Sequence, residues 1–245
     1  MSRVNLSSKT KNEKAGRFGF SRYYLYLCRL LKTATMKEID PKTTSRATAF
    51  ELWMQAPMPM VTLFKTFDVS RIVKVSRQRN WKFNMLMCWC IGKAASTVDE
   101  FYMLPVGDKL MQFDRLAVNV VVNTKSGGIS TCDIPFSENA AQFNADYLRL
   151  THKVSETGEP HDLGSDYMVI GTSAMTACEL DGVVNIYSGI YNNPFLAWGK
   201  YRKRWLKAVL PVSFQFHHTQ MDGAQAARFL NVLQEVMKKP TDMKS

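Results

Sequence analysis

The sequence predicts an α/β fold, and three stretches carry this prediction. Residues 212–237 contain a run in which Phe214 and Phe216 alternate with polar side chains, then a turn, then apolar residues at helical spacing. A period of two indicates a strand with two different faces, whereas a period near 3.6 indicates an amphipathic helix. Residues 116–122 are rich in β-branched side chains and favour a central strand, and residues 138–154 have the pattern of a long amphipathic helix. Strands and helices are thus mixed along one chain.

The remaining elements follow from the same patterns. A helix is expected to end near Trp53, because Pro57 and Pro59 follow it closely and proline cannot continue a helix. Helices are expected over residues 69–77 and 84–95, and the second is apolar on nearly all sides, so it should be deeply buried. The other expected elements are strands at 60–67, 101–103, 109–113, 116–122, 169–174 and 212–218, a loop at 185–198 and a hairpin turn at 199–207.

Length and charge suggest one folded domain with a basic tail. The chain has 245 residues, of which 46% are hydrophobic, and can bury one large core. The net charge of +11 is uneven, because residues 1–35 contain eight Lys or Arg and one Glu. We therefore expect a disordered basic extension over residues 1–35 and a folded domain over residues 36–240. Whether the extension is dispensable or serves to anchor or target the chain stays open at this point.

Several classes of protein are not expected. No apolar run is long enough to span a membrane, and a basic charge that lies mostly in a tail is weak support for nucleic-acid binding. The sequence has no glycine-rich phosphate loop, which argues against a nucleotide hydrolase. The cysteine count is odd, with no disulfide-like spacing and no metal-ligand pattern, and this favours a reducing cytoplasm. We therefore expect a cytoplasmic protein with no metal, no nucleic acid and no membrane partner.

The junction between strand and helix in residues 212–237 contains the strongest candidates for chemistry. His217 and His218 end the strand, Asp222 stands where a helix N-cap would stand, and Gly223 allows a sharp turn. By parity, His218 shares a face with the phenylalanines of the strand and occupies its last position. An imidazole at a strand end can act as a general base, so His218 is the candidate base and His217 is expected to be structural.

These residues carry a resemblance to a known family. The pattern His-His-x-x-x-Asp-Gly at residues 217–223, followed by an amphipathic helix, resembles the signature of chloramphenicol acetyltransferases. Its shorter form also marks the acyltransferase domains of 2-oxo-acid dehydrogenase complexes. Gly199-Lys200-Tyr201 precedes the motif as in the family, and the resemblance covers about residues 37–238. It implies an α/β two-layer sandwich, in which helices pack on one face of a mixed β-sheet.

The resemblance also implies an activity. Members move an acetyl group from acetyl-CoA to a hydroxyl of a small molecule, here chloramphenicol or a similar acceptor, and His218 would remove the hydroxyl proton. Arg46 would pair with Asp222 and hold the loop that carries the base, although an exposed arginine at a helix start is the simpler interpretation from sequence alone. Ser173 would donate a hydrogen bond to the oxyanion of the reaction, with Thr172 as the alternative.

Two further implications concern the donor and the assembly. Lys200 and Tyr201 would lie beside coenzyme A, whose phosphates favour a cation and whose adenine can lie on an aromatic ring. Family members are homotrimers with the active site between subunits, so a homotrimer is implied for this chain.

The sequence departs from the family pattern in two places. Met175 follows the Ser-Ala pair where a Pro-Trp pair is usual, and Gly127 and Gly128 lie where a phenylalanine usually touches the acceptor. These departures leave the acceptor open. They also keep two alternatives: an acyltransferase core like that of the dehydrogenase complexes, and a catalytically silent relative that binds a small molecule.

Overall fold

The computed structural model describes residues 36–187 and 189–239, so the expected disorder of residues 1–35 lies outside the described part of the chain. The elements in chain order are β1 (Met36–Ile39), the 3-10 turn η1 (Pro41–Thr43), α2 (Ala47–Trp53), β2 (Met60–Asp68), α3 (Ser70–Arg79), α4 (Phe83–Ala95), η2 (Asp99–Tyr102), β3 (Met103–Val106), β4 (Lys109–Phe113), β5 (Leu116–Asn123), β6 (Ile129–Pro135), α5 (Ala140–Thr157), η3 (Gly164–Asp166), β7 (Met168–Ala174), β8 (Phe195–Trp198), β9 (Arg202–Arg204), β10 (Lys207–His217) and α6 (Gly223–Lys238).

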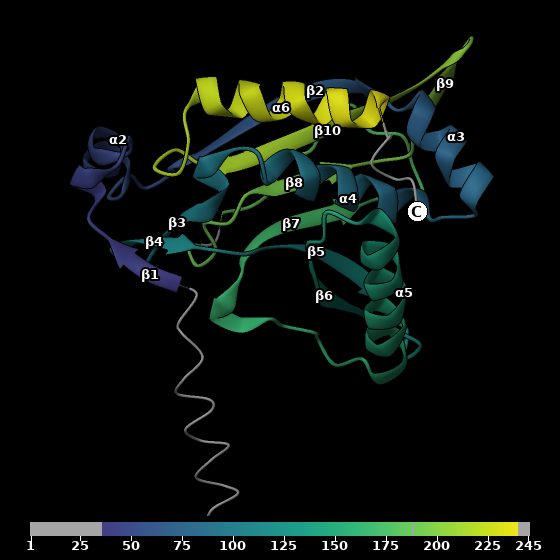
Figure 1. Ribbon diagram of the computed structural model, residues 1–245, viewed down its shortest axis with the longest axis horizontal. Coiled ribbons are helices and arrows are strands. Elements are labelled where there is room, and N and C mark those ends of the chain that lie inside the picture. Colours follow the sequence, from purple (N-terminus) through teal and green to yellow (C-terminus); the bar gives the residue numbers. More distant parts are fainter. Residues whose placement is uncertain (1–35, 188, 240–245) are drawn as a thin grey trace, which may run out of the picture. The chain divides into compact units, whose positions relative to one another are not determined.

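Most strands belong to one mixed sheet with the order β2-β10-β8-β7-β5-β6, and β9 pairs with the beginning of β10. β5, β7 and β8 run parallel, whereas β2, β6 and β10 pair with their neighbours in antiparallel fashion. β1, β4 and β3 form a separate three-stranded sheet. The helices α3, α4, α5 and α6 lie along one side of the large sheet (Figure 1). The predicted fold class, an α/β two-layer sandwich with helices on one face of a mixed sheet, is confirmed.

Side-chain alternation along β10 decides which face of the sheet carries the core. Phe214 points to the helices, where its ring centroid lies 4.8 Å from that of Phe229 on α6. Ser213 and Gln215 point to the opposite face. There, Gln215 Nε2 donates a hydrogen bond to the Asn185 carbonyl (3.1 Å), and Ser213 Oγ accepts one from the same segment. At β10, the face opposite the helices is therefore in contact with residues 183 and 185 of the segment between β7 and β8.

Several elements differ from the sequence prediction, and the strands β1 and β6 have no counterpart in it. β10 covers Lys207–His217, so it starts earlier than the predicted strand 212–218 and ends one residue sooner, with His218 in the turn. The alternation of side chains could not fix that last residue. β8 (Phe195–Trp198) lies in a stretch predicted to be a loop, because a short strand buried on both faces shows little alternation. Residues Asp99–Tyr102 form a 3-10 turn where the sequence predicts the start of a strand.

Residues 36–187 and 189–239 contain neither a candidate membrane span nor a candidate metal cluster. No helix there combines the length and the apolar character that a bilayer crossing requires. The same residues contain no group of three or more His, Cys, Asp or Glu side chains that could hold a metal ion.

Candidate active site

His218 stands at the edge of the large sheet, where β10 ends. Its backbone N–H donates a hydrogen bond to the Pro59 carbonyl (2.8 Å), which extends the pairing of β10 with β2 by one residue. Its side chain is 30% exposed. The imidazole stacks on the indole of Trp53, with ring centroids 4.7 Å apart and planes 10° from parallel. The ring is therefore held in one orientation and still open to solvent.

Arg46 fastens the loop that carries His218. The guanidinium is almost fully buried, with 1% of its side chain exposed, and it makes four hydrogen bonds across residues 218–222. Nε donates to the Thr219 carbonyl (2.9 Å) and Nη2 to the His218 carbonyl (2.9 Å). Nη1 and Nη2 donate to the two carboxylate oxygens of Asp222 at 2.7 and 3.0 Å. The contact between Arg46 and Asp222 that the resemblance implies is present, and the interpretation of Arg46 as an exposed residue is wrong.

The hydrogen bonds of Arg46 to residues 218, 219 and 222 form a clamp on the loop. Asp222 connects this clamp to the helix α6 and to the imidazole. Its backbone N–H donates to Gln225 Oε1 (3.0 Å) at the start of α6. The hydrogen bonds from Arg46 lower the pKa of the Asp222 carboxyl below its usual value, against the opposing effect of burial. Asp222 Oδ1 also lies 3.1 Å from His218 Nδ1, although the two groups are not aligned for a hydrogen bond. Because Nδ1 faces the carboxylate, Nε2 is the nitrogen left for a substrate.

His217 points into the protein and differs from its neighbour. It is 2% exposed, and its Nδ1 accepts a hydrogen bond from the Thr219 N–H (3.1 Å). Burial, assisted by the nearby charge of His218, lowers the pKa of His217 to about 4. An imidazole that stays neutral and uses one nitrogen to accept a hydrogen bond from the turn fits the structural role expected of His217.

Ser173 and Thr172 lie on β7 and point to opposite faces of the sheet. Thr172 is 3% exposed, and its hydroxyl donates a hydrogen bond to the Asn119 carbonyl (2.7 Å) inside the core. Ser173 is half-buried, and its hydroxyl makes no hydrogen bond to any described residue. Of the two alternatives, only Ser173 has a hydroxyl available to a ligand.

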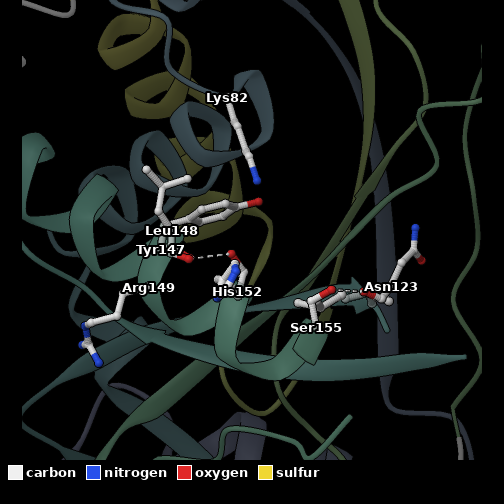
Figure 2. A pocket seen from close by; sticks show the side chains of 10 residues that line it. Lys82, Asn123, Tyr147, Leu148, Arg149, His152 and Ser155 are labelled. Atoms are coloured by element: carbon white, nitrogen blue, oxygen red, sulfur yellow. Dashed lines mark hydrogen bonds between the residues drawn. The ribbon is translucent and has the colours of Figure 1, made fainter. Parts of the chain in front are cut away.

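The C-terminal end of β5 and the helix α5 line an open cavity of about 740 Å³. Continuing the pairing of Asn119 with Gly171 by two residues brings Val121, which lines the cavity, level with Ser173. Lys82, at the start of α4, also lines it. Figure 2 shows the Lys82 amino group pointing toward the hydroxyl of Tyr147.

The two residues expected beside coenzyme A lie at this same end of the sheet. The Tyr201 ring packs 5.2 Å from Phe83, the residue after Lys82, and is half-buried. Lys200 is exposed, and its backbone N–H donates to the Cys178 carbonyl (2.7 Å). Lys82 of the cavity adds a further cation, whereas Arg149 and His152 lie beside Asp146 and Glu156. This end can therefore attract a phosphorylated ligand.

The residues predicted to form one site fall into two groups: His218, Arg46 and Asp222 at the C-terminal end of β10, and Ser173, Lys200 and Tyr201 further back along the sheet. Ser173 faces Ala197 on β8, which in turn faces Ser213 on β10. His218 lies five residues beyond Ser213, which corresponds to about 17 Å along the strand, and two strand spacings of about 4.8 Å separate β7 from β10. One copy of the chain cannot bring His218 and Ser173 to the same carbonyl group.

Two residues of these groups escaped the sequence analysis. Trp53 was placed only at a helix end, and no sequence pattern indicates that its ring covers His218. Lys82 lies just before a run of apolar residues, so its charge suggested nothing beyond a helix start. His152, on α5, also lines the cavity, as does Tyr147.

The fold and the clamped, open imidazole at the sheet edge define an enzyme of the acyltransferase class. The family model described as chloramphenicol acetyltransferase matches residues 34–234, and the chain belongs to this family. Chloramphenicol acetyltransferase 3 of Escherichia coli is 25% identical over 205 residues, which cover 81% of this chain and 95% of that protein. Chloramphenicol acetyltransferase 2 of Escherichia coli is 26% identical over 200 residues, with 80% and 94% covered.

Solved structures of two acyltransferases share the fold. A chloramphenicol acetyltransferase superposes with a TM-score of 0.75 at 17% identity, over 82% of this chain and 99% of that one. A probable dihydrolipoamide acetyltransferase from Listeria monocytogenes gives a TM-score of 0.62 at 11% identity, over 83% and 94%. The sandwich is therefore common to both kinds of enzyme, and the choice of acceptor depends on the site.

Proposed function

We propose that this enzyme is an O-acetyltransferase that moves the acetyl group of acetyl-CoA to a hydroxyl of a small acceptor, chloramphenicol or a molecule like it. The observation that carries the proposal is the His218 ring, which is held on one face by Trp53 and is still 30% exposed. Membership of the chloramphenicol acetyltransferase family supports the acceptor class. The cytoplasm, where acetyl-CoA is available, is the compartment that suits this reaction.

The chemistry assigned to His218 is general base catalysis. An acceptor hydroxyl is un-ionised at neutral pH and is a poor nucleophile until its proton leaves. His218 Nε2 takes that proton while the oxygen attacks the thioester carbonyl carbon. The resulting tetrahedral intermediate collapses, the C–S bond breaks, and the imidazolium returns the proton to the departing thiolate. The products are the acetate ester and free coenzyme A.

Arg46 and Asp222 act as positioning residues in this scheme. Arg46 ties the carbonyls of residues 218 and 219 to the carboxylate of Asp222, so the backbone on which the imidazole stands cannot swing. The Asp222 carboxylate beside Nδ1 favours the tautomer that leaves Nε2 unprotonated and ready to accept. This pinning supplies orientation rather than a second proton transfer.

The second part of the proposal concerns the residues assigned to acetyl-CoA, the acetyl donor. The Ser173 hydroxyl would donate a hydrogen bond to the oxyanion of the tetrahedral intermediate, where a single donor is typically worth about 2.7–4 kcal/mol of barrier. Lys200 and Tyr201 would lie against coenzyme A, and the cavity lined by Lys82 offers a further cation for its phosphates. These assignments need no metal.

A homotrimer with its active sites between subunits would solve the separation of the two groups. In a cyclic trimer each contact pairs one surface of a copy with a different surface of the next, so His218 of one copy can meet Ser173 of its neighbour. Apolar side chains that could support such a contact lie exposed on the segment between β7 and β8, namely Val184, Ile186, Ile190 and Tyr191. We therefore propose a trimer in which every site uses two copies.

Mixing two inactive variants tests the activity and the assembly together. His218→Ala and Ser173→Ala are purified separately, exchanged in a mild denaturant, refolded together, and assayed for thiol release from acetyl-CoA with chloramphenicol. A site regains both groups only when a Ser173→Ala copy supplies the histidine to a His218→Ala neighbour, so about one quarter of the sites should recover in an equal mixture. Activity that stays at the level of the separate variants would overturn the shared site.

The acceptor is tested on the wild-type enzyme. Thiol release should require a hydroxyl acceptor, and chloramphenicol should support it better than dihydrolipoamide. A preference for dihydrolipoamide would favour the dehydrogenase-complex type of acyltransferase. No release with any acceptor, while a small molecule still raises the thermal midpoint, would identify a catalytically silent binding protein.

A further inference from the structure

The tip of the β9–β10 hairpin exposes two large apolar side chains to solvent. Trp205 and Leu206 form the two-residue connection, and their relative exposures are 104% and 96%. Trp205 has a φ of 49°, in the left-handed region that two-residue hairpin turns reach most easily with glycine. The chain thus places an indole where glycine would fit the backbone better. In Figure 1 this hairpin extends away from the rest of the sheet beside α3.

Cations surround the tip, and acidic residues are scarce in the flanking sequence. Lys203, Arg204 and Lys207 lie within two residues of the apolar pair and are exposed. Lys203 and Arg204 form no ion pair with the residues that the structure describes. Residues 182–221 contain no Asp or Glu. The acidic groups near the base of the hairpin, Glu179 and Asp181, form ion pairs with Arg202. Lys207 lies close enough to Asp68 for its charge to lower the pKa of that carboxyl.

The neighbouring helix α3 continues the basic surface. Its exposed face carries Arg71, Lys74 and Arg77, and residues 69–98 contain no acidic side chain. Arg77 lines a cavity of about 180 Å³ together with Trp205 and Leu206, so the helix and the hairpin tip adjoin. The cations of α3 and of the hairpin therefore form one continuous cluster, which lies behind the apolar side chains of Trp205 and Leu206.

We propose that this hairpin tip docks on an anionic lipid bilayer. The order along the projection, with indole and leucine outermost and cations one or two residues behind, matches the order of acyl boundary and phosphate headgroups in a membrane interface. A nucleic acid would use the cations but would leave a projecting leucine without an apolar partner. The inference revises the sequence expectation that the protein has no membrane partner, and it is independent of the acyl transfer proposed above.

The test uses the full chain and vesicle sedimentation. Wild-type protein is mixed with vesicles of phosphatidylcholine alone, or of phosphatidylcholine with equimolar phosphatidylglycerol, and should sediment with the second. The double variant Trp205→Gly with Leu206→Ser removes both apolar groups, while glycine suits the turn, so its thermal midpoint should equal or exceed that of the wild type. Its partition should fall by about tenfold or more. Ile129→Ser, at an exposed position on another hairpin, is the matched control and should leave partition unchanged.

A second arm removes charge at the same place. Lys203→Glu with Arg204→Glu should lower partition onto the anionic vesicles by at least about fivefold for each cation lost, whereas Lys153→Glu on α5 should not. The proposal is overturned if the Trp205 and Leu206 variant binds anionic vesicles as well as wild type. Binding that depends on charge alone, and that a nucleic acid competes away, would likewise overturn it in favour of a general polyanion surface.

Discussion

The two groups of candidate residues differ in how their polar groups are satisfied: the turn after β10 that holds His218, here called the closed end, and the region of Ser173 and Lys200, here called the open end. At the His218 end, the polar groups of the turn are tied to the protein itself, because Arg46 satisfies two carbonyls and a carboxylate and Trp53 covers one face of the imidazole. At the open end, the Ser173 hydroxyl makes no hydrogen bond to a described residue and Lys200 is exposed, whereas Arg149 and His152 of the cavity lie beside the carboxylates of Asp146 and Glu156. At the closed end, folding of one chain supplies the hydrogen-bond partners of the polar groups. At the open end, a ligand or another copy of the chain has to supply them. Substitutions at the two ends should therefore separate stability from activity.

The largest expected effect comes from removing the base itself. His218→Ala should lower the rate of thiol release by about 10²–10⁴-fold, because the general base is lost and the neighbouring Asp222 carboxylate is held by Arg46. The thermal midpoint should stay near that of the wild type, since the ring is partly exposed and Arg46 binds the backbone rather than the imidazole. A steady-state assay and a melting curve on the same preparation check both claims. Wild-type turnover in this variant would end the assignment.

The open end should show the opposite balance between activity and stability. Ser173→Ala should reduce kcat by about 10²–10³-fold with little change in stability, because its hydroxyl bonds to no described residue. Thr172→Val is the matched control one residue away. It removes a buried hydroxyl that donates to the Asn119 carbonyl, and should cost about 1 kcal/mol of stability while leaving kcat within about twofold. If the two variants exchange these behaviours, Thr172 is the oxyanion donor.

Arg46 belongs to the closed end, so its loss should damage folding and catalysis together. Arg46→Ala leaves the carbonyls of residues 218 and 219 unpaired and frees the loop, at a cost of about 2–4 kcal/mol in urea unfolding. The rate should fall by up to about 10²-fold, because a small displacement of the imidazole misaligns the attack. Asp222→Asn should give the same pattern at smaller size, since half of the clamp survives. A rate loss with an unchanged free energy of unfolding would contradict the pinning role.

The sequence predicted the closed end better than the open one, for a physical reason. His218, Asp222 and Gly223 lie within six residues, so strand parity and the turn already indicate their arrangement, and Arg46 followed from the family pattern. The stack of Trp53 on His218 joins residues far apart in the chain and leaves no periodic trace. Phe83 meets Tyr201 just after β8, a strand too short and too buried to detect from the sequence. The separation of Ser173 from His218 needed the strand register, which alternation does not supply.

The smallest expected effect is on the pH dependence of the free energy of unfolding. Because burial lowers the pKa of His217 to about 4, the unfolded chain takes up this proton at a higher pH than the folded chain does. Between about pH 6.5 and 4 the free energy of unfolding should therefore fall as pH falls, whereas above that range His217 contributes no slope. The lowered pKa of Asp222 acts in the same direction but only further down, below the usual carboxyl range near pH 4.

His217→Asn isolates this contribution. The amide oxygen can still accept the Thr219 N–H but cannot titrate, so urea unfolding at pH 7, 6 and 5 should give a flatter dependence than in the wild type, at some constant loss of stability from the smaller side chain. The KM for acetyl-CoA at pH 7 should not change, because His217 lies at the closed end, remote from Lys200 and Tyr201. An unchanged pH slope would mean that the buried imidazole is not the group that titrates. A changed KM would mean that the two ends are not as independent as the register of β10 implies.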